Sequence, residues 1–140
     1  MSYADNLSIQ ERRSHFRNVA SVAAKDGVIN NEERAVLAFV AQKWKLTDED
    51  LRDVTEHPNA IEMALPNDRL ACFQQLYDLV EIMIVDGMVR IKERELCTSL
   101  AVNLGFTPDA VDTIIQAILK GNLSSRDEKD IQADLIRKLL

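Results

Sequence analysis

Apolar residues recur at intervals of three and four along most of the chain, the spacing that predicts amphipathic α-helices. In the first such stretch, Phe16, Val19 and Ala23 share one face. Glycine, proline and capping residues divide the pattern into segments. Near the C-terminus, Gly121 would end one helix, and Ser125 with Glu128 would form a capping box at the start of the last. The predicted helices span residues 8–25, 31–45, 48–56, 67–85, 91–104, 107–121 and 126–139. No stretch alternates apolar and polar residues as a half-buried strand would. The predicted fold class is therefore an all-α bundle of seven helices.

The helical pattern itself repeats at an offset of sixty residues. The matched pairs include Asp26 with Asp86, Gly27 with Gly87, Glu33 with Glu93 and Arg34 with Arg94. We therefore predict a single domain over 1–140, built from pseudo-repeats at about 8–57 and about 67–120. A linker at 59–66 joins them and a helix at about 126–139 closes the fold. Neither half could bury its apolar faces alone, so we expect a shared core.

The fourth predicted helix is apolar over a wide arc, which is typical of a central helix. Its polar stripe is formed by Gln74, Asp78 and Glu81. In the first helix Arg12, Arg13 and Arg17 form a small basic run, which we interpret as a solvated face.

Composition narrows the class of protein. With 46% hydrophobic and 29% charged residues the chain resembles an ordinary globular protein, and its net charge of −6 opposes binding to nucleic acid or anionic lipid. The N-terminus does not read as a signal peptide, and no stretch approaches the ~20 apolar residues that span a bilayer, so we expect no direct membrane insertion. Cys72 and Cys97 form no Cys-x-x-Cys motif, which favours reduced core residues in a cytoplasmic protein. His15 and His57 are too few for a zinc site.

The two Asp-Gly turns are the candidate site, and a purely structural interpretation covers much of what they contain. Gly27 and Gly87 would end a helix in a positive-φ conformation. Glu33 would reach back to the backbone amide of Asn30 in a capping box. Each Asp could pair with the matched Arg34 or Arg94, or accept hydrogen bonds from turn amides.

Two details favour a functional interpretation as well. Each Asp lies at a helix C-terminus, where the helix dipole disfavours an anion by ~0.3–1 kcal/mol. In the second turn Arg90 replaces Asn30, so the side-chain cap is lost, yet Glu93 is kept. If the two turns lie side by side, Asp26, Glu33, Asp86 and Glu93 converge on an acidic site, with Asp78 and Glu81 as further contributors. Such an oxygen-only site suits Ca²⁺, Mg²⁺ or Mn²⁺. The turns are not EF-hand loops, because Gly follows the first Asp immediately.

The duplicated turn resembles the motif of the TerB-like family, which is named for a tellurite-resistance protein and includes the N-terminal domain of DjlA-type co-chaperones. The first copy reads Asp26-Gly27-Val28-Ile29-Asn30-Asn31-Glu32-Glu33-Arg34. The second copy reads Asp86-Gly87-Met88-Val89-Arg90-Ile91-Lys92-Glu93-Arg94. The resemblance covers roughly residues 10–120 and departs from the pattern at Arg90 and Lys92, whose charges could neutralise the second turn. It implies a seven-helix domain with pseudo-twofold halves and an acidic cluster proposed to bind a divalent metal. It also implies a stress-response role, often in membrane-associated protein complexes, with no established enzymatic activity.

Three hypotheses for function follow. The leading one is a non-catalytic interaction or scaffold domain of the tellurite-resistance type, whose acidic turns bind a divalent cation or a basic partner protein. The second is a structural or oligomerising domain, in which acidic residues only cap helices and residues 126–140 pack on a second copy or close their own core. The third, ranked last, is a metal-dependent hydrolase using the same carboxylates.

Overall fold

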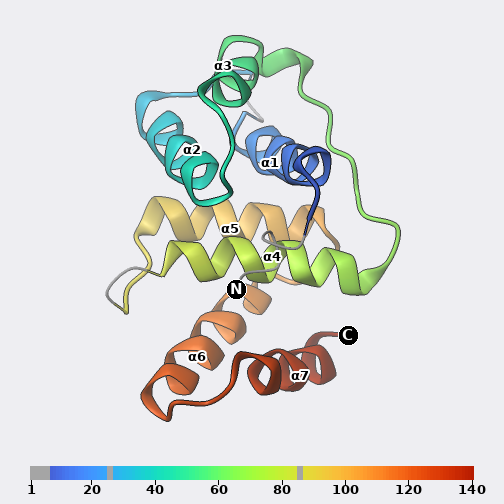
Figure 1. Cartoon of the computed structure of the whole chain (residues 1–140), viewed down its shortest axis with the longest axis vertical. Helices are drawn as coiled ribbons and strands as arrows, with labels where there is room; N and C mark the ends of the chain where they lie inside the picture. Colours follow the sequence, from blue (N-terminus) through green and yellow to red (C-terminus); the bar gives the residue numbers. More distant parts are fainter. Residues whose placement is uncertain (1–6, 25–26, 85–86) are drawn as a thin grey trace. The chain divides into compact units, whose positions relative to one another are not determined.

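The computed structural model describes residues 7–24, 27–84 and 87–140. Within this part of the chain the structure contains helices and no strand, so the predicted all-α fold is confirmed (Figure 1). The helices are α1 (Ile9–Ala23), α2 (Asn31–Lys43), α3 (Asp48–Glu56), a 3₁₀ turn η2 (Pro58–Ala60), α4 (Arg69–Met83), α5 (Ile91–Asn103), α6 (Asp109–Leu123) and α7 (Glu128–Leu139). Within the described ranges, no helix is both long and apolar enough to cross a membrane.

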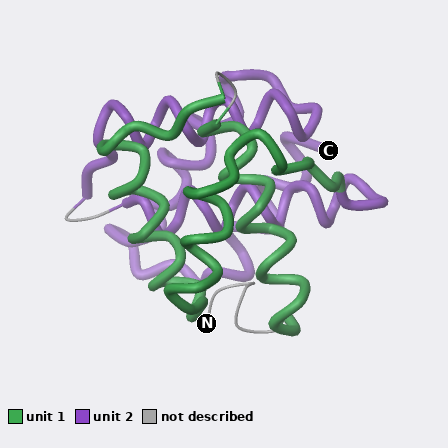
Figure 2. The backbone as a smooth tube through the Cα atoms, turned by 90° about the horizontal axis from the view of Figure 1, so that it is seen from above, with its two compact units in different colours: residues 1–65 green, residues 66–140 purple. Residues whose placement is uncertain are grey.

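The chain forms two compact units, Met1–Leu65 and Pro66–Leu140, which Figure 2 shows in different colours. Their boundary falls within the linker predicted at 59–66. In unit 1, α1 packs against α2 and α3, and α2 packs against α3. In unit 2, α4 packs against α5 and α6, and α7 packs against α6. The single domain with one shared core stays a prediction.

Helix boundaries in the two units recur at the offset seen in the sequence. Helix α4 begins and ends sixty residues after α1, and α5 begins and ends sixty residues after α2. The buried positions recur as well, since Leu37, Val40 and Ala41 of α2 correspond to Cys97, Leu100 and Ala101 of α5. The third helix differs in length, because α3 has 9 residues and α6 has 15.

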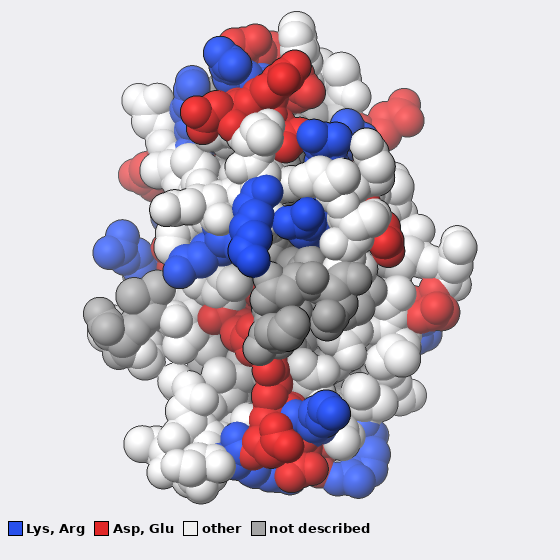
Figure 3. All heavy atoms as spheres, viewed as in Figure 1, with Lys and Arg blue, Asp and Glu red and all other residues white. Residues whose placement is uncertain are grey.

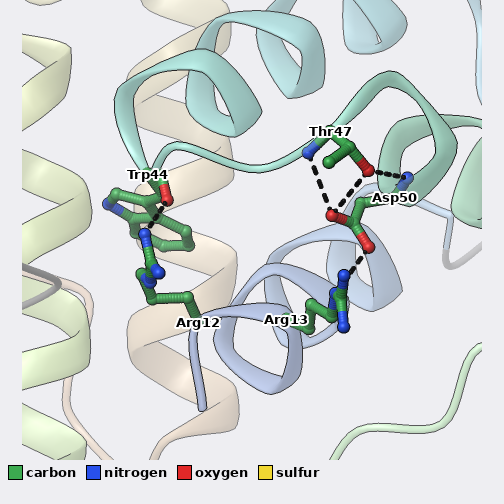
Figure 4. Close-up of polar contacts among 5 residues, drawn as sticks. All are labelled: Arg12, Arg13, Trp44, Thr47 and Asp50. Atoms are coloured by element: carbon green, nitrogen blue, oxygen red, sulfur yellow. Dashed lines mark hydrogen bonds and ion pairs between the residues drawn. The ribbon is translucent and has the colours of Figure 1, made fainter. Parts of the chain in front are cut away.

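In unit 1, two arginines attach α1 to the end of α2 and to the first turn of α3 (Figure 4). Arg13 Nε donates to Asp50 Oδ1 at 2.8 Å, and Arg12 Nη1 donates to the carbonyl of Trp44 at 3.1 Å. The other oxygen of Asp50 accepts from the amide and hydroxyl of Thr47, both at 3.0 Å. Burial raises the pKa of Asp50, but the bonds from Thr47 and the charge of Arg13 outweigh it and lower that pKa overall. The predicted solvated basic face was therefore wrong for Arg12 and Arg13, since each has a partner on another element.

A buried asparagine fixes the end of unit 1. Asn18, fully buried on α1, donates from Nδ2 to the carbonyl of Ala64 and accepts from the amide of Ala64, both at 2.8 Å. This pairing satisfies two backbone groups of a segment without regular secondary structure. It also explains a polar residue among the apolar positions of α1.

In unit 2, the ends of α6 and α7 differ from the prediction. Gly121 was expected to end α6, but the helix continues to Leu123 and Gly121 is buried within it. A Cβ at this position would lie 2.2 Å from Cδ1 of Ile131 on α7, so the glycine permits close packing of the two helices. Ser125 was expected to cap α7, but it has a φ of 54° and the N-cap is Asp127. The first error arises because Gly121 serves a tertiary contact rather than a helix end, and the second because Ser125 takes part in ending α6, where its amide donates to the carbonyl of Asn122.

Candidate functional site

From Gly27 onward, the first turn has the local structure that its sequence predicts. Gly27 has a φ of +79°, a conformation that a residue with a side chain rarely adopts. Three residues later Asn30 caps α2, and the predicted capping box is confirmed. The Asn30 amide donates to Glu33 Oε1 at 3.0 Å, and the Glu33 amide donates to Asn30 Oδ1 at 2.8 Å. One oxygen of Glu33 is therefore engaged in holding the helix end.

The second turn keeps half of this arrangement. Gly87 has a φ of +77°, and the amide of Arg90 donates to Glu93 Oε2 at 3.4 Å. A guanidinium has no acceptor, so the side chain of Arg90 cannot return the bond as Asn30 does. Glu93 therefore caps the N-terminus of α5 from one side only, which gives the persistent glutamate a structural role.

The arginines that follow the two glutamates differ in their surroundings. Arg94 forms an ion pair with Asp112 of α6. The position in unit 1 that matches Asp112 is Arg52, so an equivalent pair with Arg34 cannot form there. The proposed pairing of each turn Asp with its own arginine stays a prediction, and Arg94 already has one carboxylate partner.

The structure describes two of the four predicted metal ligands, Glu33 and Glu93. Asp26 and Asp86 lie outside the described residues. Glu33 and Glu93 belong to different units, and each contributes one oxygen to a helix cap. In the described ranges, no group of three or more His, Cys, Asp or Glu side chains is arranged to hold a metal ion. A cation site formed by Asp26, Glu33, Asp86 and Glu93 is therefore still a prediction.

A separate carboxyl cluster lies in unit 2, where α4 faces the start of α7. Asp78 is 2% exposed, and Glu81 lies three residues further along α4. Burial raises the pKa of Glu81 to about 8, and a hydrogen bond with Glu128, the charge of Glu128 and the charge of Asp78 act in the same direction. Because burial and nearby like charges both disfavour ionisation, the pKa of Glu81 lies above neutral pH, and its protonated carboxyl can donate to Glu128.

Neutral polar side chains extend this cluster. The Nε2 of Gln74 donates to Oε1 of Gln132 on α7 at 3.2 Å. Tyr77 hydrogen-bonds to Gln132 as well, and its pKa is raised by burial first and then by the charges of Glu81, Glu128 and Asp78. The interface between α4 and α7 thus contains a polar layer that includes one acid, Glu81, whose pKa is raised to about 8.

The sequence identified only part of this layer. Asp78 and Glu81 were predicted to contribute to the cation site at the turns, whereas the structure places Glu81 against Glu128. Glu128 was predicted only as a capping residue. The polar stripe of α4 was the available signal, because polar residues on such an apolar helix require polar partners. Its partner could not be read from local spacing, since the contacts join residues far apart in the chain.

Acidic residues also gather over α3 on the face shown in Figure 3. The exposed acids of this helix are Asp48, Glu49, Asp53 and Glu56. Near the α6–α7 end of the same view, acidic and basic atoms are mixed.

Comparison with models of known protein families, with curated proteins and with solved structures found no match.

Proposed function

We propose that this chain is a non-catalytic interaction domain of the TerB-like type, whose acidic turns bind a divalent cation or a basic partner protein. The ligands would be Asp26, Glu33, Asp86 and Glu93, and the cation Ca²⁺, Mg²⁺ or Mn²⁺. By the same resemblance, the domain would act in a cytoplasmic stress response of the tellurite-resistance type, within membrane-associated protein complexes.

The observation that carries this proposal is the recurrence of the helix boundaries. Helices α1 and α2 recur as α4 and α5 at one offset, and each pair is joined by an Asp-Gly turn followed by a capping glutamate. A duplicated helix pair with this turn is the pattern on which the resemblance rests.

Exposed apolar residues at both turns support a role in binding. Val28 is 66% exposed, and Met88, at the matched position of unit 2, is 71% exposed. Exposed apolar side chains are common singly, but here they recur at the same place in two turns of the same structure. A protein partner would remove both from water.

Titration with CaCl₂, MgCl₂ and MnCl₂ tests the cation-binding proposal. Calorimetry should detect binding, and a cation at a hundred times its Kd should raise the free energy of unfolding by ~2.7 kcal/mol. The Asp26→Asn/Asp86→Asn variant should lose both effects, whereas Asp48→Asn on the exposed face of α3 should keep them. Absence of heat, of added stability and of chemical-shift changes at the turns would leave cation binding without support.

The position of α7 favours one form of the structural alternative, in which residues 126–140 close their own core. Ile131 and Leu135 of α7 are buried, and Ile131 packs against Gly121 of α6. These contacts favour a helix that closes its own unit over one that packs on a second copy. Deletion of residues 126–140 should then lower stability without changing the oligomeric state, as measured by light scattering.

A further inference from the structure

The two turns have matching backbones but different exposed side chains. In unit 1 the three residues around the start of α2 are Asn30, Asn31 and Glu32. In unit 2 the corresponding residues are Arg90, Ile91 and Lys92. All six are exposed. Because the helices begin at matched positions, the difference lies in what the two turns present to solvent.

The side chains of the second turn are unfavourable for the free protein. Ile91 is 76% exposed and Met88 is 71% exposed, so neither gains from burial. Arg90 occupies a position where Asn30 provides a helix cap in unit 1. Lys92 lies 3.8 Å from Glu95, but both side chains are 62% exposed and such a pair contributes little to stability. The fold alone accounts for none of these choices.

We propose that Met88, Arg90, Ile91 and Lys92, here named the basic corner, bind an acidic protein segment that carries apolar side chains. Two cations and two apolar side chains on one short, exposed stretch match a segment of that composition in charge and hydrophobicity. The proposal rests on the proposed interaction role and assigns it a further surface on the turn of unit 2, which lies between the proposed ligands Asp86 and Glu93 and carries more positive charge than the matched stretch of unit 1.

The overall charge favours a protein segment over a lipid surface. A net charge of −6 repels an extended anionic bilayer, whose field acts on the whole molecule. A short acidic segment meets mainly the local charge of the basic corner, because salt screens more distant charges. Binding should therefore be local and sensitive to salt.

The chain supplies its own matched variants for a test. Arg90→Asn/Ile91→Asn/Lys92→Glu gives unit 2 the residues that unit 1 carries at the same backbone positions, so the variant should fold. Asn30→Arg/Asn31→Ile/Glu32→Lys is the reciprocal change. The probe is a fluorescein-labelled amphipathic peptide of about 15 residues, with leucine on one face and glutamate on the other.

The full chain should bind this peptide by fluorescence anisotropy, and the unit 2 variant should bind it at least about tenfold more weakly. The reciprocal variant should bind more tightly than the parent chain. A peptide with lysine in place of glutamate should not bind at the basic corner, and raising NaCl from about 50 to about 500 mM should weaken the authentic complex. Circular dichroism confirms that each variant is folded.

Other outcomes would overturn the proposal. Equal peptide affinity in the parent and the folded unit 2 variant would remove the basic corner from binding, as would the absence of any binding. Binding of the parent chain to anionic phosphatidylglycerol vesicles, lost in the unit 2 variant, would assign the corner to lipid instead. Cation binding is measured separately on the Asp26 and Asp86 variants, so failure here leaves that result intact.

Discussion

Glu81 is the residue whose ionisation should affect stability most directly. Its pKa is raised from an ordinary 4.5 to about 8 in the folded chain. Between these values the folded state keeps a proton that the unfolded state releases, so the free energy of unfolding should fall as pH rises through this window. Glu81→Gln removes the titration and keeps a neutral side chain that can donate to Glu128. Relative to the parent, the free energy of unfolding of the variant should increase by about 1–2 kcal/mol as the pH rises from 5 to 9. This energy is set below the full effect of the pKa shift because Glu81 is partly exposed.

Urea unfolding at a series of pH values measures this effect. The exposed Glu62→Gln variant is the control and should follow the parent at every pH. If the difference between Glu81→Gln and the parent does not change with pH, the pKa of Glu81 is not raised in the folded state.

The cap of α5 gives a second prediction at the residue scale. Arg90→Asn should complete the capping box with Glu93 and add ~0.5–1 kcal/mol to the free energy of unfolding. Asn30→Ala at the matched position should lower it by a similar amount, because it removes the bond to the Glu33 amide. Chemical denaturation measures both. A loss of stability in Arg90→Asn would show that the arginine makes a stabilising contact in the folded chain.

At this scale the sequence predicts features that depend on neighbouring residues. The positive φ of Gly27 and Gly87 and the box formed by Asn30 and Glu33 follow from local steric and hydrogen-bonding rules. The partners of Asn18 and Glu128 do not, because each lies more than forty residues away in the chain. Side-chain choice at such positions is governed by tertiary contacts.

At the scale of elements, the number and type of the helices were predicted because apolar periodicity is a strong signal over long segments. The ends of α6 and α7 were not, since a glycine near a helix end can serve either as a stop or as a close-packing site. In Gly121 the packing role prevails, and Asp127 rather than Ser125 caps the next helix.

The contact between α6 and α7 yields a test of that packing. Gly121→Ala should lower the free energy of unfolding by about 1–3 kcal/mol, because its Cβ would overlap Ile131, despite the better helix propensity of alanine. Ile131→Val removes Cδ1, the atom closest to the new Cβ. It should therefore lower the free energy of unfolding by less in the Gly121→Ala background than in the parent. A double-mutant cycle by thermal unfolding measures this coupling. Additive effects would mean that α7 shifts away without meeting the new methyl group.

At the scale of the whole molecule, the cation hypothesis requires ligands from both units. If Asp26 and Asp86 hold the same ion, calorimetry should give one cation per chain, and either Asp26→Asn or Asp86→Asn should abolish most of the affinity. Separate weak sites would instead give two cations per chain, each removed by one variant. The positive charges of Arg90 and Lys92 predict that Arg90→Asn/Lys92→Glu tightens cation binding at a shared site.

The duplicated turn divides its positions between two tasks. In both units its glycine adopts a positive φ and its glutamate caps the helix start, while three of the exposed positions between them, 30–32 in unit 1 and 90–92 in unit 2, carry unrelated side chains. The exposed side chains of one turn can therefore change, and with them what that turn binds, while the other turn keeps its binding properties. Such a change need not disturb folding.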